Sequence, residues 1–354
     1  MMEIIKHKIK EGDTLKSIAK EYNITVDELV DFHNKNGGIT QQIIGNDLPF
    51  HLEFIVLSIN SFKNFVIDNI EKGNNLLSYN NRYRCEQNNL ILIDGKPSFS
   101  AQTKTQYLLS SKKDLGYSLL NVLLEDYVTS VQPQNMEGAF ELIKQIELIR
   151  DKITFNHSNG KIDKIVNIDE LHDKWNVFIN ETSATIPFYN ELKSKSPEVI
   201  NDFIENGKKE FSNEDVFCEV ISKNLFFHLL VKVYNEDKNK EYTFNQMSQI
   251  FPEISLKINV IKSVVSDNEN TQKVRFVGNL DESSFNINTI KNLYEKLYQP
   301  IIKFSFTEFD FVYRITYEIE KETNVLLNAS VSIKESVKNN YEVITKYELR
   351  KVEL

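Results

Sequence analysis

The chain has 354 residues, of which 26% are charged, and its formal net charge is −9. At roughly 150 residues per domain, this length predicts two or three domains. The acidic balance argues against nucleic acid as a main partner, because nucleic acid requires a basic face. The 23 Phe and 15 Tyr residues supply enough apolar area for a substantial core, which excludes a globally disordered chain.

The sequence carries no signal for secretion or membrane insertion. Ile4 and Ile5 are followed directly by Lys6, whereas a signal peptide needs an apolar run of roughly 7–15 residues. The longest apolar stretches, such as 225–233, are far shorter than the ~20 residues of a transmembrane helix. We therefore expect a soluble, cytoplasmic protein, with export by a dedicated secretion machine as the alternative. The two cysteines, Cys85 and Cys218, cannot form a disulfide framework, which fits a reducing compartment or inert thiols.

Residues 7–58 predict the order strand, helix, helix, strand. Residues 7–10 alternate like a short strand, and either Asp13 or Thr14 can cap the helix that follows. One apolar stripe of that helix consists of Leu15, Ile18, Ala19 and Tyr22. Thr25, with Glu28 three residues later, predicts a capping box at the start of a second helix. A closing strand is expected at about 52–57.

These residues resemble the LysM family over about residues 6–58. The resemblance rests on Ile9, Gly12, Asp13, Thr14, Leu15, Ile18 and Ala19, then Leu29 and Asn34, then a late Ile-x-Gly-x-x-Leu element. It implies a βααβ module that binds N-acetylglucosamine-containing glycans such as peptidoglycan or chitin. The family's groove would be formed by Gly12, Asp13, Thr14 and Leu15 on one side, and by Asn34, Ile43 and Ile44 on the other. The alternative is that 12–15 form a turn and a helix cap that serve the fold alone.

The rest of the chain predicts an α+β domain with a large antiparallel sheet covered by helices. We expect a module at 1–58, a connecting segment at 59–81, and the α+β domain at 82–354, with a split into two sub-domains near 185–240 as an open alternative. Strands are expected within 82–131, with 119–128 open to a buried-helix interpretation, and again from 254 onwards. A helix is expected at 136–150, where Ala139, Phe140, Ile143 and Ile146 recur at helical spacing. Further helices are expected around Trp175, within 186–235, including one from 213 to about 234, and at 290–297, ended by Pro300. A similar order of strands and helix at 98–166 and 254–334 hints at an internal duplication.

The C-terminal region has the clearest alternation. The residues that share one parity are Phe309, Phe311, Tyr313, Ile315, Tyr317 and Ile319, while the intervening positions are mostly charged or polar. The parity repeats at 325–333 and again at 341–349. Three long antiparallel strands with one buried and one solvated face follow from this pattern. The helices at 136–150, 188–234 and 288–298 are the expected cover of the buried face.

Templates for catalysis and metal binding fail. The sequence has no phosphate-binding loop, no Gly-x-Ser-x-Gly elbow and no His-Glu-x-x-His. Its six histidines lack metal-ligand spacing, so we expect neither metal nor cofactor. Glu318, Glu320 and Glu322 lie about 7 Å apart along a strand, as glycosidase carboxylates do, but they belong to the solvated face. We do not expect an enzyme.

Three functional hypotheses remain. The first is a non-catalytic binding or adaptor protein, whose LysM-like module holds a glycan and whose α+β domain engages a protein partner. The second is a cytoplasmic scaffold or adaptor of a contractile injection or secretion apparatus. The third is a cell-wall hydrolase or effector with a site that the sequence does not reveal.

Overall fold

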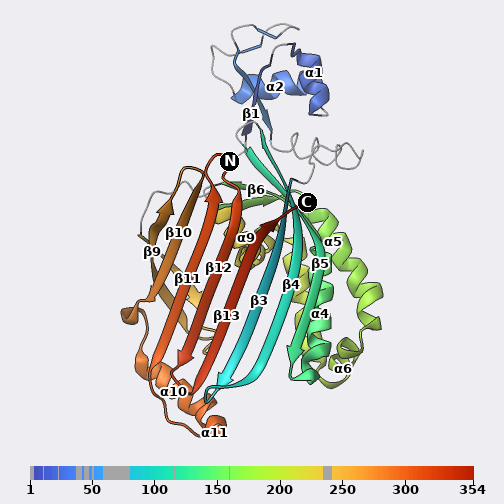
Figure 1. The fold of residues 1–354 in the computed structure, drawn as a ribbon. Coiled ribbons are helices and arrows are strands. Elements are labelled where there is room, and N and C mark those ends of the chain that lie inside the picture. The colour runs from blue at the N-terminus through green and yellow to red at the C-terminus, as the bar shows by residue number, and fades with distance from the viewer. Residues whose placement is uncertain are drawn as a thin grey trace.

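The structure is a computed structural model, and it describes residues 4–10, 12–22, 24–36, 42–43, 48–49, 52–58, 80–114, 117–158, 160–233 and 241–354. It confirms the α+β class. A small N-terminal module precedes an 11-stranded antiparallel sheet with helices (Figure 1). In the described part of the chain, every helix is too short or too polar to span a lipid bilayer.

The N-terminal module has the predicted βααβ order. Its elements are β1 (Ile4–Lys8), α1 (Leu15–Glu21), α2 (Val26–Asn36) and β2 (Phe54–Ser58). β1 pairs with β2 in antiparallel orientation, so the two ends of the module meet in one small sheet. The capping box at the start of α2 is confirmed, because the Thr25 N–H donates to Glu28 and the Glu28 N–H donates to Thr25 Oγ1.

The apolar stripe of α1 forms the core of the module. Its buried side chains are Leu15, Ile18, Ala19 and Tyr22, joined by Leu29 of α2 and Ile55 and Leu57 of β2. His33 of α2 is also fully buried, and its Nδ1 accepts a hydrogen bond of 2.9 Å from the Val56 N–H. Leu119 and Val166 of the larger domain pack in the same apolar cluster.

The large sheet contains every strand from β3 to β13. These are β3 (Asn81–Ile93), β4 (Lys96–Asp114), β5 (Tyr117–Gln132), β6 (Lys152–Ser158), β7 (Lys161–Ile165), β8 (Glu241–Met247), β9 (Ser255–Asp267), β10 (Thr271–Leu280), β11 (Phe309–Glu320), β12 (Leu326–Val337) and β13 (Tyr341–Val352). Their order is β7-β6-β5-β4-β3-β13-β12-β11-β10-β9-β8. β3 and β13 meet in the middle, with Arg82 opposite Val352 and Ile93 opposite Tyr341. Strands from both sides of the 185–240 region therefore share one sheet.

The helices lie between strands in the chain. They are α4 (Glu137–Ile149), α5 (Ile168–Val177), α6 (Pro187–Lys195), α7 (Pro197–Ser212), α8 (Glu214–Lys223), α9 (Leu225–Val233), α10 (Ile287–Leu297) and α11 (Gln299–Ile302). In Figure 1, α9 lies behind the sheet, α4 and α5 are seen at the side of β5, and α10 and α11 lie at the end opposite the C-terminus. The face of the sheet toward the viewer carries no helix in this view.

One parity of each strand faces the helices and makes the core. Tyr313, Ile315 and Tyr317 are buried as the alternation predicts, whereas Arg314 between them is exposed. Aromatic rings join the layers: Tyr107 of β4 stacks on Phe226 of α9 with centroids 4.1 Å apart. The core is thus a layer of helices pressed on one side of a twisted sheet.

Three details differ from the sequence-based expectations. The edge strand β8 was not predicted, because its side chains alternate only between exposed and half-buried positions and leave a weak apolar pattern. The helix expected over 213–234 is two helices, since Asn224 ends α8 and its side chain caps α9 by accepting from the Phe226 N–H at 3.0 Å. Pro300 does not end a helix but occupies the first turn of α11, where no intrahelical N–H bond is lost.

The apolar face of α4 is rotated from the expected one. Ile143 was expected on the inner stripe, yet 43% of its surface is exposed. Leu142 and Ile149 are the buried residues of this helix. α4 is apolar over more than one face, so hydrophobic spacing alone does not determine which side meets the sheet.

Candidate functional site

The turn between β1 and α1 depends on a glycine. Gly12 has φ +92°, a backbone conformation that other residues rarely adopt, and a Cβ there would meet no atom within 4 Å. The requirement is thus conformational and not steric. Gly12 is exposed, so its backbone lies open at the rim of the module.

Asp13 closes this turn and does not cap α1. Its Oδ2 accepts a hydrogen bond of 2.7 Å from the Lys10 N–H, and its own N–H donates to the Lys10 carbonyl at 3.1 Å. The same Oδ2 lies 3.2 Å from Nε2 of His7. Burial acts to raise the pKa of Asp13, but the hydrogen bonds from Lys10 and His7 outweigh it, and the net pKa lies below the usual value.

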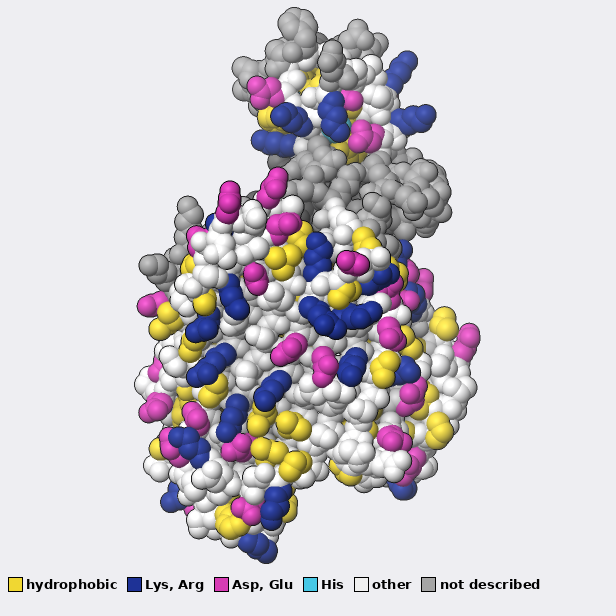
Figure 2. All heavy atoms as spheres, viewed as in Figure 1, with side chains coloured by type: hydrophobic (Ala, Val, Ile, Leu, Met, Phe, Trp, Pro, Cys, Tyr) yellow, Lys and Arg dark blue, Asp and Glu magenta, His cyan; other side chains and the backbone are white. Residues whose placement is uncertain are grey.

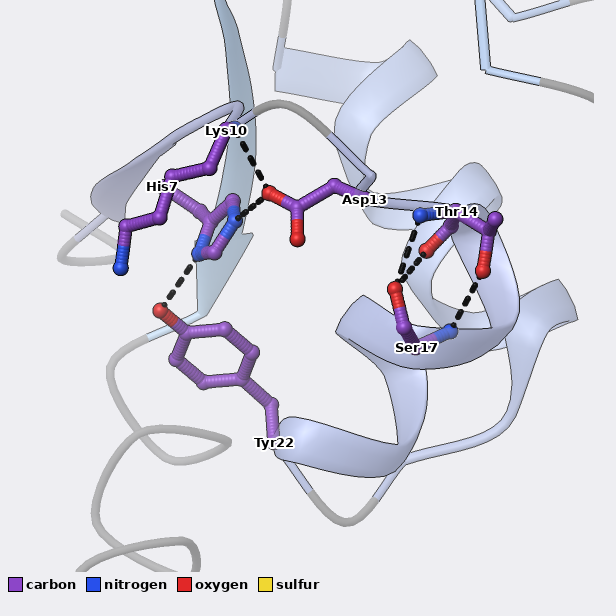
Figure 3. A network of polar contacts seen from close by, with 6 residues as sticks. All are labelled: His7, Lys10, Asp13, Thr14, Ser17 and Tyr22. Carbon is purple, nitrogen blue, oxygen red and sulfur yellow. Dashed lines mark hydrogen bonds and ion pairs between the residues drawn. The ribbon is translucent and has the colours of Figure 1, made fainter.

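His7 connects the turn to the far end of α1. It is 1% exposed, and its Nδ1 lies 2.9 Å from the Tyr22 hydroxyl (Figure 3). Figure 3 shows one Asp13 oxygen engaged by both Lys10 and His7, while no contact is drawn to the other oxygen. The sequence motifs assign His7 no role beyond its place in the first strand. The sequence feature that indicates this connecting role is a histidine on the strand that leads directly into the turn containing Asp13.

Thr14 is the N-cap of α1. The Ser17 N–H donates to Thr14 Oγ1 at 3.0 Å, and the Thr14 N–H donates to Ser17 Oγ at 2.8 Å, which forms a reciprocal capping box. Of the two capping candidates from the sequence, the structure therefore selects Thr14. Leu15, the next residue, is 2% exposed and packs into the core of the module.

Asn34 holds the segment that follows α2. Its Nδ2 donates to the Ile43 carbonyl and its Oδ1 accepts from the Ile43 N–H, both at 2.8 Å. The side-chain amide thus pairs with one backbone unit as a neighbouring strand would. Ile43 is 2% exposed, and Ile44 lies outside the described residues.

The predicted site residues divide into two kinds. Leu15 and Ile43 are buried, so they can shape a groove but cannot touch a ligand in this conformation. Gly12 and Thr14 are exposed and Asp13 is half-buried, so these three can present polar groups to a ligand. The assignment of all seven residues to glycan binding stays a prediction.

The large domain contains no group of three or more His, Cys, Asp or Glu residues that could hold a metal ion among the residues described. Burial raises the pKa of Cys85 to about 12 and, with nearby carboxylates, that of Cys218 to about 12, so both are protonated thiols at neutral pH. Glu318 accepts a hydrogen bond of 2.9 Å from Asn328, and this bond holds the pKa of its carboxyl below the usual value.

Comparison with known proteins identifies the module. Residues 7–32 match the LysM domain, so this part of the chain is a LysM domain. No curated protein matches the sequence. Among solved structures, the chain is similar to one of lipovitellin described by its lipid–protein interactions, with 9% identity and a TM-score of 0.36. That similarity covers 77% of this chain and 25% of the lipovitellin chain, so the chain spans about a quarter of that protein's length.

Proposed function

We propose that the protein binds an N-acetylglucosamine-containing glycan, with peptidoglycan as the first candidate, through its LysM domain. The observation that carries the proposal is the match over residues 7–32, which includes the turn at Gly12, Asp13 and Thr14. The two hydrogen bonds between the Asn34 side chain and the Ile43 backbone, here called the Asn34–Ile43 clamp, support the proposal. They hold in place the segment after α2, which forms the second side of the predicted groove.

The groups available to a sugar are few and polar. The second oxygen of Asp13 can accept from a sugar hydroxyl or an acetamido N–H, since the first oxygen already serves Lys10 and His7. The exposed backbone at Gly12 lets a pyranose ring approach closely. Leu15 and Ile43 act beneath this surface and keep its shape.

The larger domain acts, in this proposal, as a non-catalytic adaptor for a protein partner. Its two thiols are protonated, and the carboxylate row at Glu318 lies on the solvated side of the sheet. Muropeptide profiles that stay unchanged after incubation with the protein are the expected result. New cleavage products would establish an enzyme instead.

A second candidate function is a scaffold of a contractile injection apparatus. It is favoured because the polar side chains of Asp13, Thr14 and Asn34 already form hydrogen bonds within the module. The module therefore does not need a glycan to satisfy these groups when it folds. Cell fractionation that finds the protein in the cytosol would favour this candidate, and recovery with the cell wall would favour the first.

Sedimentation with purified peptidoglycan tests glycan binding. We expect the full-length chain to pellet with the glycan and soluble N-acetylglucosamine oligomers to release it. Asp13→Asn should lower the bound fraction several-fold, whereas Asp27→Asn should not. Asp27 is an exposed residue in the first turn of α2, and its replacement removes the same charge outside the predicted groove. Protein that stays wholly in the supernatant would reject the proposal.

A further inference from the structure

The uncovered face of the large sheet is polar and carries most of the arginines. Figure 2 shows dark blue Lys and Arg side chains and magenta acidic side chains spread over this face. Only six of the 42 basic residues in the chain are Arg. Five of them lie on the strands of this sheet: Arg82, Arg84, Arg275, Arg314 and Arg350.

Strand parity places all five side chains on the same face. Each lies next to residues that are buried against the helices, such as Tyr83 beside Arg82 and Arg84, or Phe276 beside Arg275. Because neighbouring side chains of a strand point to opposite faces, the arginines point away from the helices. The sixth, Arg150, forms ion pairs with Glu147 and Glu210 near the end of α4. The residue type best suited to bidentate anion binding is therefore concentrated on one surface.

Three cations of this face line one hollow of about 570 Å³. They are Arg275 of β10, Arg314 of β11 and Lys346 of β13, and Thr316, Ser332 and Glu348 also line it. Ser332 lies directly opposite both Arg314 and Lys346 in the neighbouring strands. With strands about 4.8 Å apart, the Cα atoms of these two cations are roughly 10 Å apart with a small side chain between them.

Arg275 completes the arrangement from the third side. It lies opposite Thr316, which is two residues from Arg314 on the same strand, so Arg275 and Arg314 are diagonal neighbours. Thr316 and Ser332 add hydroxyl groups between the cations. The hollow is thus bordered by long basic side chains and contains short hydroxylic ones.

The hollow carries an excess of positive charge, whereas some other cations of the same face are paired with carboxylates. Arg82 pairs with Glu125 at 2.8 Å and Lys334 pairs with Glu342 at 3.0 Å. Arg275, Arg314 and Lys346 form no ion pair with any residue in the described part of the chain. Glu348 is the single carboxylate among the lining residues, so three positive charges face one negative charge in a chain of net charge −9.

We propose that this hollow binds the phosphate group of a soluble ligand. A phosphate dianion has the charge to match the excess of cations, and its oxygens accept bidentate hydrogen bonds from guanidinium groups. The hydroxyls of Thr316 and Ser332 can donate to the remaining oxygens. The volume falls in the range of small-molecule sites, about 300–1,000 Å³.

Calorimetric titration of the full chain with inorganic phosphate at constant ionic strength tests the proposal. We expect one saturable site, with acetate binding more weakly because it carries a single charge. Arg314→Gln should weaken phosphate binding by about tenfold or more, the effect of losing a charged hydrogen-bonding pair. Ser332→Leu, which fills the hollow without changing any charge, should weaken it as well.

Arg350→Gln is the matched control. Arg350 is exposed on the same face, makes no ion pair with a residue that the structure describes, and does not line the hollow. Its replacement should leave phosphate affinity within about twofold, since screened charges outside the site add little. If Arg350→Gln and Arg314→Gln weakened phosphate binding equally, the binding would depend on the overall surface charge and not on the hollow, and the proposal would be overturned. No saturable binding would overturn it too, as would binding to phosphatidic acid vesicles without binding of free phosphate.

Discussion

Glu335 of β12 offers the sharpest test of how the large domain is held together. It is fully buried, with 0% of its surface exposed. Its Oε1 accepts from the Ser248 hydroxyl and from the Ile250 N–H at 3.2 Å, and its Oε2 accepts from the Gln249 N–H at 2.7 Å. One carboxylate thus fixes the loop that joins β8 to β9 onto the middle of the sheet.

Removing this carboxylate should be strongly destabilising. In Glu335→Ala, three donors lose their acceptor, and each unsatisfied buried donor costs about 1–3 kcal/mol. Because water and relaxation recover part of this, we expect a loss of about 3–5 kcal/mol in the free energy of unfolding. Glu335→Gln keeps one acceptor oxygen but turns an amino group toward a donor, so its loss should be about 1–2 kcal/mol.

The pH dependence gives an independent check on the charge. Burial raises the pKa of Glu335, and the hydrogen bonds from Ser248, Gln249 and Ile250 only partly offset this effect. A raised folded-state pKa gives stability that is fully present below the unfolded value of 4.5 and is lost as the pH rises through the folded value. The stability advantage of the wild type over Glu335→Gln should therefore shrink as the pH rises from the acidic range.

Urea unfolding followed by tryptophan fluorescence is the assay. The chain has one tryptophan, and Trp175 is 2% exposed in the core of the large domain, so its emission reports unfolding of that domain. Glu342→Gln is the control, because Glu342 pairs with Lys334 at 3.0 Å near the solvent and should contribute about 0–1 kcal/mol. If Glu335→Ala were no less stable than Glu342→Gln, the loop would not depend on the buried carboxylate and the reasoning would be wrong.

Three further predictions follow from buried groups. Burial, with a smaller effect of Lys232, lowers the pKa of His228 to about 3, so the stability due to its neutral form is present above the unfolded value of 6.5 and is lost as the pH falls. Between pH 7 and pH 5, wild type should lose about 2 kcal/mol more than His228→Leu in urea unfolding, and parallel losses would contradict this assignment. Asn34→Ala removes both bonds to the Ile43 backbone and should speed amide hydrogen exchange at Ile43 about tenfold or more; unchanged exchange would mean that the clamp is not formed in solution. In Gly207→Ala the new Cβ would lie 2.2 Å from the Trp175 ring, so overpacking should lower stability by about 1–3 kcal/mol, whereas a site with room would gain stability from the better helix former.

Structural features whose residues all lie close together in the sequence were predictable. The capping box of Thr25 and Glu28 is one example, because both partners lie within one helical turn. The alternation over 309–319 and 329–349 is another, since a strand's own residues determine which face is apolar. At the start of β12 the expected parity is wrong, because a register shift against β11 buries Leu326 in place of Leu327. The LysM domain belongs to the same class, because its turn, cap and apolar stripe are contiguous.

Features that depend on strand register were not predictable. The basic hollow exists because Arg275, Arg314 and Lys346 come into register across four strands, and nothing near each residue specifies the others. Likewise, Glu335 gave no local sign of its role, since its partners lie more than 80 residues earlier in the chain. In the N-terminal module, the bond between His7 and Tyr22 joins a strand to the end of a helix and follows from tertiary packing.

The pairing of β3 with β13 has a consequence for how the domain folds. Within each half of the sheet, consecutive strands of the chain are neighbours, so pairing closes only turns or connections that hold one or two helices, such as 133–151 and 281–308. At the seam, by contrast, Thr345 donates a hydrogen bond to Asn89 across a separation of 256 residues. Closing a loop of that length has a large entropic penalty unless both surfaces are already formed. We therefore expect the half-sheets β3–β7 and β8–β13 to form first. The pairing of β3 with β13 should form last, so that the centre of the finished sheet is the latest part to fold.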